Sequence, residues 1–91
     1  MSVHVRIPTI LRSYTDGASE VTAEGDTLSA VLDDLEASYS GIRSRIVDET
    51  GDLRRFVNVY VGNDDVRFLE NLETKTPDGT QISVIPAVAG G

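Results

Sequence analysis

The stretch Ile82-Ser83-Val84-Ile85-Pro86-Ala87-Val88-Ala89-Gly90-Gly91 decides how the rest of the chain must be arranged. Its first four residues form an apolar run that is typical of a buried strand. Residues 86–91 are predicted to form a flexible tail beyond that strand, reaching about 20 Å at roughly 3.3 Å per residue. Because glycine has no Cβ, a Gly-Gly end can enter a narrow channel and leaves the terminal carbonyl carbon open to attack. The alternative interpretation is a frayed chain end.

Few side chains outside this stretch are suited to chemistry. The 91 residues are enough for one domain, and they include no cysteine, one histidine (His4) and one lysine (Lys75). Thiol chemistry, disulfides and a histidine-cluster metal site are therefore excluded. We expect no catalytic, cofactor-binding or metal-binding residue in the chain, and we interpret it as a protein that is not itself an enzyme.

The net charge of the chain restricts its partners. A formal charge of −7 argues against binding to nucleic acid or to anionic membrane surfaces, and it favours a basic or neutral partner. The sequence contains no apolar run long enough to span a membrane, and its first residues lack the apolar core of a signal peptide. We therefore expect the protein in the cytoplasm.

Residues 25–42 contain the clearest secondary-structure pattern. Gly25-Asp26-Thr27 is typical of a helix start, with Asp26 or Thr27 as the N-cap. Gly41 is expected to end the helix as its C′ residue, with Ile42 making the apolar contact of a Schellman motif. One stripe of apolar residues follows the helical repeat: Leu28, Val31, Leu32, Leu35 and Tyr39. Such a one-sided helix must lie on a sheet.

Alternating apolar residues predict strands on both sides of this helix. The expected strands are 3–7, 19–23, 56–61, 66–68 and 82–85, with the first two forming a hairpin. Residues 43–55 are polar and are interpreted as a loop. The helix should bury Val3, Val5, Ile7, Val57, Val59, Val61, Ile82 and Val84. One helical stripe covers one face of one sheet, so the sequence predicts a two-layer α+β domain with a mixed sheet of four to five strands.

The sheet face opposite the helix is the predicted partner-docking face. Strand alternation places seven side chains on it: His4, Arg6, Phe56, Asn58, Tyr60, Ser83 and Ile85. Phe56, Tyr60 and Ile85 would form an apolar cluster with Arg6 in its polar rim, which is typical of an interaction surface. The alternative is that long side chains or the 43–55 loop cover this face.

The element order and the protruding Gly-Gly end resemble the ubiquitin-like β-grasp fold and, more narrowly, the ThiS/MoaD family of prokaryotic sulfur carriers. The features that match are Gly25-Asp26-Thr27-Leu28, the Asp78-Gly79 turn and residues 82–91. Within that family, segments 7–12, 34–36, 39–42, 55–58 and 65–68 resemble the actinobacterial CysO-type carriers. The resemblance implies a β-grasp domain over 1–85 and a flexible Gly-Gly tail over 86–91.

The resemblance also implies the reaction and the partners. An ATP-dependent, E1-like enzyme would adenylate Gly91, and sulfur would replace AMP to give a terminal thiocarboxylate. A PLP-dependent cysteine synthase would accept that sulfur, and a metallopeptidase would release the cysteine formed. The residues inserted into these partners would be Pro86, Ala87, Val88, Ala89 and Gly90. ATP and PLP belong to the partners, so this chain is expected to bind no cofactor and to be a monomer when free.

Three alternatives stay open at this point. The same thiocarboxylate could supply sulfur to molybdopterin, thiamin or a secondary metabolite, because all of these pathways would use the same terminus. The chain could instead be a ubiquitin-like protein modifier whose Gly91 forms isopeptide bonds to lysines. It could also be a β-grasp binding module in which the tail has no role.

Overall fold

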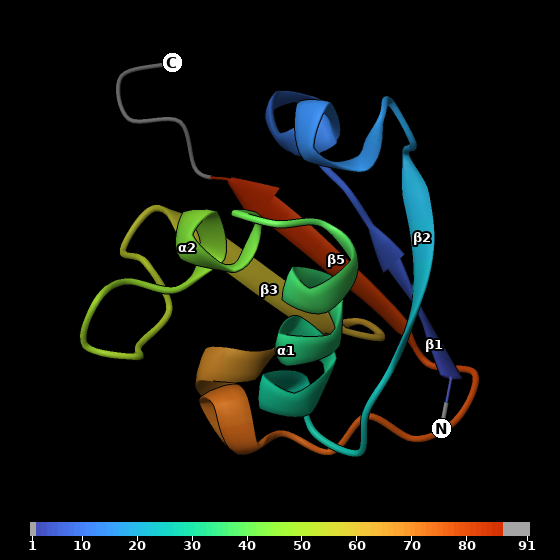
Figure 1. The fold of residues 1–91 in the computed structure, drawn as a ribbon. Coiled ribbons are helices and arrows are strands. Elements are labelled where there is room, and N and C mark those ends of the chain that lie inside the picture. Colours follow the sequence, from blue (N-terminus) through green and yellow to red (C-terminus); the bar gives the residue numbers. More distant parts are fainter. Residues whose placement is uncertain (1, 87–91) are drawn as a thin grey trace.

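The computed structural model describes residues 2–86, which form a five-stranded mixed sheet with a helix packed on one face (Figure 1). The strands are β1 (Ser2–Arg6), β2 (Glu20–Glu24), β3 (Val57–Val61), β4 (Asp64–Asp65) and β5 (Gln81–Pro86). The α-helices are α1 (Leu28–Ser38) and α2 (Arg43–Ile46), and the 3-10 helices are η1 (Thr9–Thr15), η2 (Val66–Phe68) and η3 (Asn71–Glu73).

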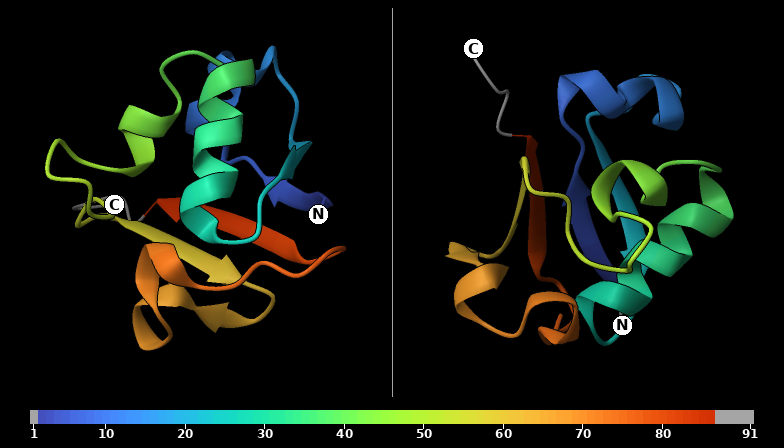
Figure 2. Two further views of the ribbon diagram at one scale, coloured as in Figure 1. Left: turned by 60° about the horizontal axis from the view of Figure 1, so that its bottom comes forward. Right: turned by 90° about the vertical axis from the view of Figure 1, so that its left-hand side faces the viewer.

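The last strand of the described chain lies in the middle of the sheet. The strand order is β2-β1-β5-β3-β4, with β1 parallel to β5 and antiparallel to β2, and with β3 antiparallel to both β5 and β4. The start of β1 and the end of β5 therefore lie at opposite ends of the sheet (Figure 2). This arrangement confirms the predicted α+β fold, the mixed sheet and the β1–β2 pairing.

The core lies between α1 and the sheet, as the apolar stripe predicts. Leu28, Val31, Leu32 and Leu35 are at most 1% exposed. The same core contains buried residues of the sheet and Ile7, which follows β1: Val3, Val5, Ile7, Val57, Val59, Ile82 and Val84. Val61 and Tyr39 are only partly buried and pack at the margin of this core. Burial of large apolar side chains, at roughly 1.5–3 kcal/mol each, is the main source of stability for such a domain.

The start of α1 follows the sequence closely. Thr27 is the N-cap, because its Oγ1 accepts a hydrogen bond from the Ala30 N–H at 3.3 Å. Gly25 lies where a Cβ would come within 2.6 Å of the Val31 backbone nitrogen. The glycine therefore allows the chain to pass directly against the first turns of the helix.

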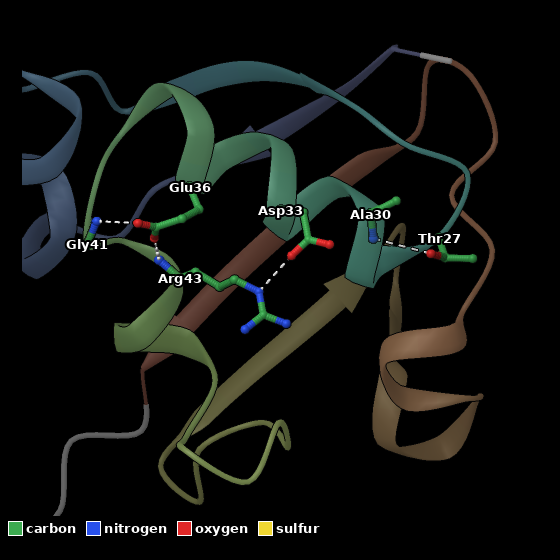
Figure 3. Close-up of polar contacts among 6 residues, drawn as sticks. All are labelled: Thr27, Ala30, Asp33, Glu36, Gly41 and Arg43. Atoms are coloured by element: carbon green, nitrogen blue, oxygen red, sulfur yellow. Dashed lines mark hydrogen bonds and ion pairs between the residues drawn. The ribbon is translucent and has the colours of Figure 1, made fainter.

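The end of α1 is held differently from the predicted Schellman motif (Figure 3). Tyr39 is the C-cap, and Gly41 lies two residues beyond it with a φ of +95°. The carboxylate of Glu36 accepts the Gly41 N–H at 2.8 Å and the Arg43 N–H at 2.9 Å. The Glu36 carboxylate thus accepts the N–H groups that would donate to helix carbonyls in a Schellman motif. The same carboxylate joins α1 to α2.

An ion pair reinforces this junction between α1 and α2. Arg43 Nε lies 2.9 Å from Asp33 Oδ1 in an ion pair, but the N–H of Arg43 Nε does not point at that oxygen and makes no hydrogen bond (Figure 3). The polar pattern of residues 43–55 predicts a loop, but the structure has the short helix α2 at its start. Ile46 and Val47 are buried there and attach the segment to the core.

The prediction of a strand over 66–68 is wrong, because these residues form η2. The Asp65 carboxylate accepts the Arg67 N–H at 2.9 Å and caps a 3-10 turn. The Arg67 guanidinium donates to Asn58 Oδ1 and to the Arg54 carbonyl, each at 2.8 Å. Only Asp64 and Asp65 pair with β3, so the strand expected here is reduced to two residues.

The last strand is longer than predicted, because β5 includes Pro86, which the sequence placed in the tail. Pro86 is in register with Val57 of β3. Pairing with β1 ends at Ser83, so this part of β5 has an unpaired edge, where the missing N–H of a proline is tolerated. Among residues 2–86, no helix is long and apolar enough to cross a membrane.

Candidate functional site at the tail end of the sheet

The candidate site is the end of the sheet from which residues 87–91 continue, called here the tail end. Because β1 is parallel to β5, β1 finishes at this end, with Arg6 in the register of Ser83. Because β3 is antiparallel to β5, β3 begins at this end, with Val57 opposite Pro86. Segments that follow β1 and precede β3 therefore lie on either side of the last residue of β5.

The predicted docking face is accessible on the outer side of the sheet. Phe56 is 53% exposed and Ile85 is 48% exposed, while Tyr60 is partly buried. The 43–55 segment therefore leaves Phe56 and Ile85 exposed, while the role of this face in docking stays a prediction. Arg6 and Tyr60 are both in register with Ser83, so the three side chains form one row across β1, β5 and β3.

Two depressions border the end of β5, and they separate two of the predicted docking residues. Ile85 lines the first depression together with Arg6, Pro8 and Pro86. Phe56 lines the second, with Arg54, Arg55, Val57 and Asp48. Ile85 and Phe56 therefore line separate depressions, so the structure does not join them into one apolar hollow.

Two hydrogen bonds from arginine side chains to backbone carbonyls fix the segments that line these depressions. Arg12 Nε donates to the Ile7 carbonyl at 3.1 Å, which holds η1 against the end of β1. Arg54 Nε donates to the Ser44 carbonyl at 2.8 Å, which holds the segment before β3 against α2. The arginines were not identified as a group from the sequence, because they come from distant segments of the chain.

No cluster of three or more potential metal-ligating side chains occurs within the described range 2–86. The predicted reactive residue Gly91 and the predicted inserted residues Ala87, Val88, Ala89 and Gly90 lie outside the described residues. The structure therefore locates the body that presents the tail, while the roles of these five residues stay predictions.

Comparison with known proteins decides the family. The sequence model described as "ThiS family" matches residues 5–91, which is most of the chain and includes the tail. The chain belongs to the ThiS family.

A ThiS-family relative in Mycobacterium tuberculosis, named sulfur carrier protein CysO, is 55% identical over 93 residues and covers all of both chains. The crystal structure of M. tuberculosis CysO, an antigen, matches at a TM-score of 0.91 and 53% identity, over 94% of this chain and 99% of that one. A chain in the crystal structure of the Amycolatopsis orientalis BexX/CysO complex matches at a TM-score of 0.93 and 48% identity, over 98% and 99%. These matches confirm the ubiquitin-like β-grasp fold of this ThiS-family chain.

A further relative carries a name from another functional class. The small archaeal modifier protein 3 of Haloferax volcanii is 38% identical over 65 residues, covering 71% of this chain and 70% of that protein. The ThiS-family fold thus occurs in proteins named as sulfur carriers and in proteins named as modifiers.

Proposed function

We propose that this ThiS-family chain is a sulfur carrier whose reactive group is the carboxylate of Gly91. The observation on which this depends is the family match over residues 5–91, which runs through the Gly-Gly end. The full-length identity of 55% to a protein named sulfur carrier protein CysO supports the same function. The absence of cysteine leaves no side-chain thiol that could carry the sulfur instead.

Two steps performed by an E1-like activating enzyme would load the carrier. A carboxylate oxygen of Gly91 attacks the α-phosphorus of ATP, the bond to pyrophosphate breaks, and an acyl-adenylate forms. Hydrosulfide then attacks the acyl carbon, AMP leaves with the bonding electrons, and loss of a proton gives the thiocarboxylate. Glycine suits this position, since no side chain crowds the acyl carbon.

Cysteine biosynthesis is the pathway we propose for the loaded carrier. A PLP-dependent cysteine synthase would join the sulfur to the β-carbon of an amino acid derived from O-phosphoserine, with phosphate as the leaving group. An S-to-N acyl shift then gives a peptide bond between Gly91 and the new cysteine, and a metallopeptidase hydrolyses that bond. ATP and PLP would be bound by these partners, and the cytoplasm stays the expected compartment.

The partners would contact the docking face while the tail is inserted. Phe56, Tyr60 and Ile85 supply apolar area beside the start of the tail, and Arg6 lies in the same row as Tyr60. Exposed aromatic and aliphatic side chains with a polar rim are typical anchors of protein interfaces.

Alanine substitutions test the docking face. Replacing Phe56, Tyr60 and Ile85 together by alanine is expected to weaken binding to the activating enzyme by at least about tenfold. Phe68→Ala is the matched control, because Phe68 is 86% exposed and lies on η2. Isothermal calorimetry would measure both affinities. An unchanged affinity in the triple variant would refute the docking face.

Changes at the terminus test the function itself. One alanine added after Gly91 should abolish sulfur transfer to the synthase, because the reactive acyl group would no longer be glycine and would be displaced along the channel. One alanine added before Met1 is the control and should have no effect. Sulfur transfer that survives the C-terminal addition would contradict the proposal.

Protein modification is the second candidate, and the match to small archaeal modifier protein 3 favours it. Under this function Gly91 would form isopeptide bonds to lysines of other proteins. Immunoblots of lysates from the native host distinguish the two functions. A ladder of covalent conjugates that disappears when Gly91 is deleted would support modification.

A further inference from the structure

Four arginines surround the end of β5, although they come from three separate segments of the chain. Arg6 ends β1 and Arg12 lies in η1, and both line the first depression beside Pro86. Arg54 and Arg55 precede β3, and both line the second depression. We call these four residues the basic collar.

The basic collar contrasts with the charge of the rest of the molecule. It contains four of the eight basic residues in a chain of net charge −7. Without these four positive charges the rest of the chain has a net charge of −11. Asp48 is the one carboxylate among the residues that line the two depressions. The tail end is therefore locally positive, and the remainder of the molecule is strongly negative.

No close ion pair neutralises the collar within the described chain, and its nearest negative charge is Asp48, whose pKa is lowered mainly by the Thr50 hydrogen bond and also by the charge of Arg54. Across residues 2–86, no carboxylate lies within 4.0 Å of a collar guanidinium. Glu20 is in register with Arg6, but its carboxylate lies 3.7 Å from His4 Nδ1 and accepts from Gln81 Nε2 at 3.3 Å. The hydrogen bonds of Arg12 and Arg54 go to backbone carbonyls, which fix the side chains and leave their charges unpaired.

We infer that the basic collar docks on a protein partner with an acidic rim around the entrance of the channel that takes the tail. This inference rests on the proposed function, in which residues 87–91 enter such a channel. Like charges grouped without counter-ions destabilise the free protein slightly, and an acidic rim would compensate them. The negative body would be repelled by the same rim, so the tail end would approach first. The inferred partner surface is therefore acidic, whereas the net charge of the whole chain predicts a basic or neutral partner.

Charge-neutral variants of two exposed collar residues test this inference. Arg6 and Arg55 are exposed and make no side-chain hydrogen bond within residues 2–86, so Arg6→Gln with Arg55→Gln should fold normally. Arg45→Gln with Lys75→Gln is the charge control, because it changes the net charge equally at two exposed positions outside the collar, and it also removes the hydrogen bond from Arg45 Nε to the Tyr14 hydroxyl. Circular dichroism melting curves establish that both variants are folded.

The measurement is the association rate constant with the E1-like activating enzyme, by stopped-flow fluorescence at low and high salt. The collar variant should associate about tenfold more slowly at low salt, and the difference should fade as salt screens the charges. The control variant should stay within about twofold of the wild type. Equal slowing of both variants, no slowing, or slowing that is independent of salt would each overturn the inference.

Two measurements distinguish a failure of this inference from a failure of the proposed function. Adenylation of wild-type carrier at saturating enzyme tests the proposed function alone, and its absence would refute that function. If wild-type adenylation occurs and the collar variant associates as fast as the wild type, only the collar inference fails.

Discussion

Gly25 shows how one residue without a side chain allows the helix to approach the chain that precedes it. A Cβ at this position would lie 2.6 Å from the Val31 nitrogen and 2.8 Å from the Ala30 carbonyl carbon. Both are backbone atoms, so only a shift of α1 itself could relieve the overlap. We expect Gly25→Ala to lower the free energy of unfolding by about 1–3 kcal/mol, as measured by urea denaturation.

Gly17 provides the control for this substitution. A Cβ there would meet nothing within 4 Å, although the φ of +88° makes an alanine strained. Gly17→Ala should therefore cost only about 1 kcal/mol from backbone strain. A loss for Gly25→Ala no greater than that for Gly17→Ala would contradict the steric explanation.

At the scale of elements, the Glu36 carboxylate fixes how α1 continues into α2. The N–H groups of Gly41 and Arg43 donate to it and hold the pKa of Glu36 below its ordinary value. Because this pKa is lower in the folded state, the contribution to stability is complete above the unfolded pKa of about 4.3. It is lost as the pH falls through the folded value.

The pH dependence of a Glu36 variant tests this junction. We expect Glu36→Gln to lower the Tm at neutral pH, with the difference from wild type shrinking as the pH falls below the unfolded pKa of about 4.3 and through the lower folded value. Glu49→Gln is the control, since Glu49 is exposed and makes no side-chain hydrogen bond within residues 2–86. A Tm difference that persisted at the lowest pH would show that Glu36 acts through packing instead.

The elements that could be predicted are those set by local patterns. The stripe from Leu28 to Leu35 and the alternation in β1, β3 and β5 were sufficient to derive the two layers. The 3-10 turn of η2 could not be predicted, because Arg67 is fixed there by Asn58 and the Arg54 carbonyl, which are distant in the chain. The end of α1 was mispredicted because Gly41 is a usual C′ residue, whereas Glu36 supplies the hydrogen bonds here.

At the scale of the whole molecule, the position of β5 connects the fold with the proposed function. It pairs with β1 from Gln81 to Ser83 and with β3 from Ile82 to Pro86. A partner that binds the tail therefore acts on a strand whose last residues are held by β3 alone. Topology also brings Arg6 and Arg55 to the same end, so the basic collar could not be seen in the sequence, where the net charge indicated a basic or neutral partner.

Thiocarboxylate formation at Gly91 can be measured by the intact mass of the protein after incubation with ATP, a sulfide source and the activating enzyme. We expect a mass increase equal to one oxygen-to-sulfur exchange, with fragmentation placing the sulfur on Gly91 and with no increase when ATP is omitted. A protein that keeps its original mass under these conditions, or that gains sulfur at any other residue, would not be a sulfur carrier acting through Gly91.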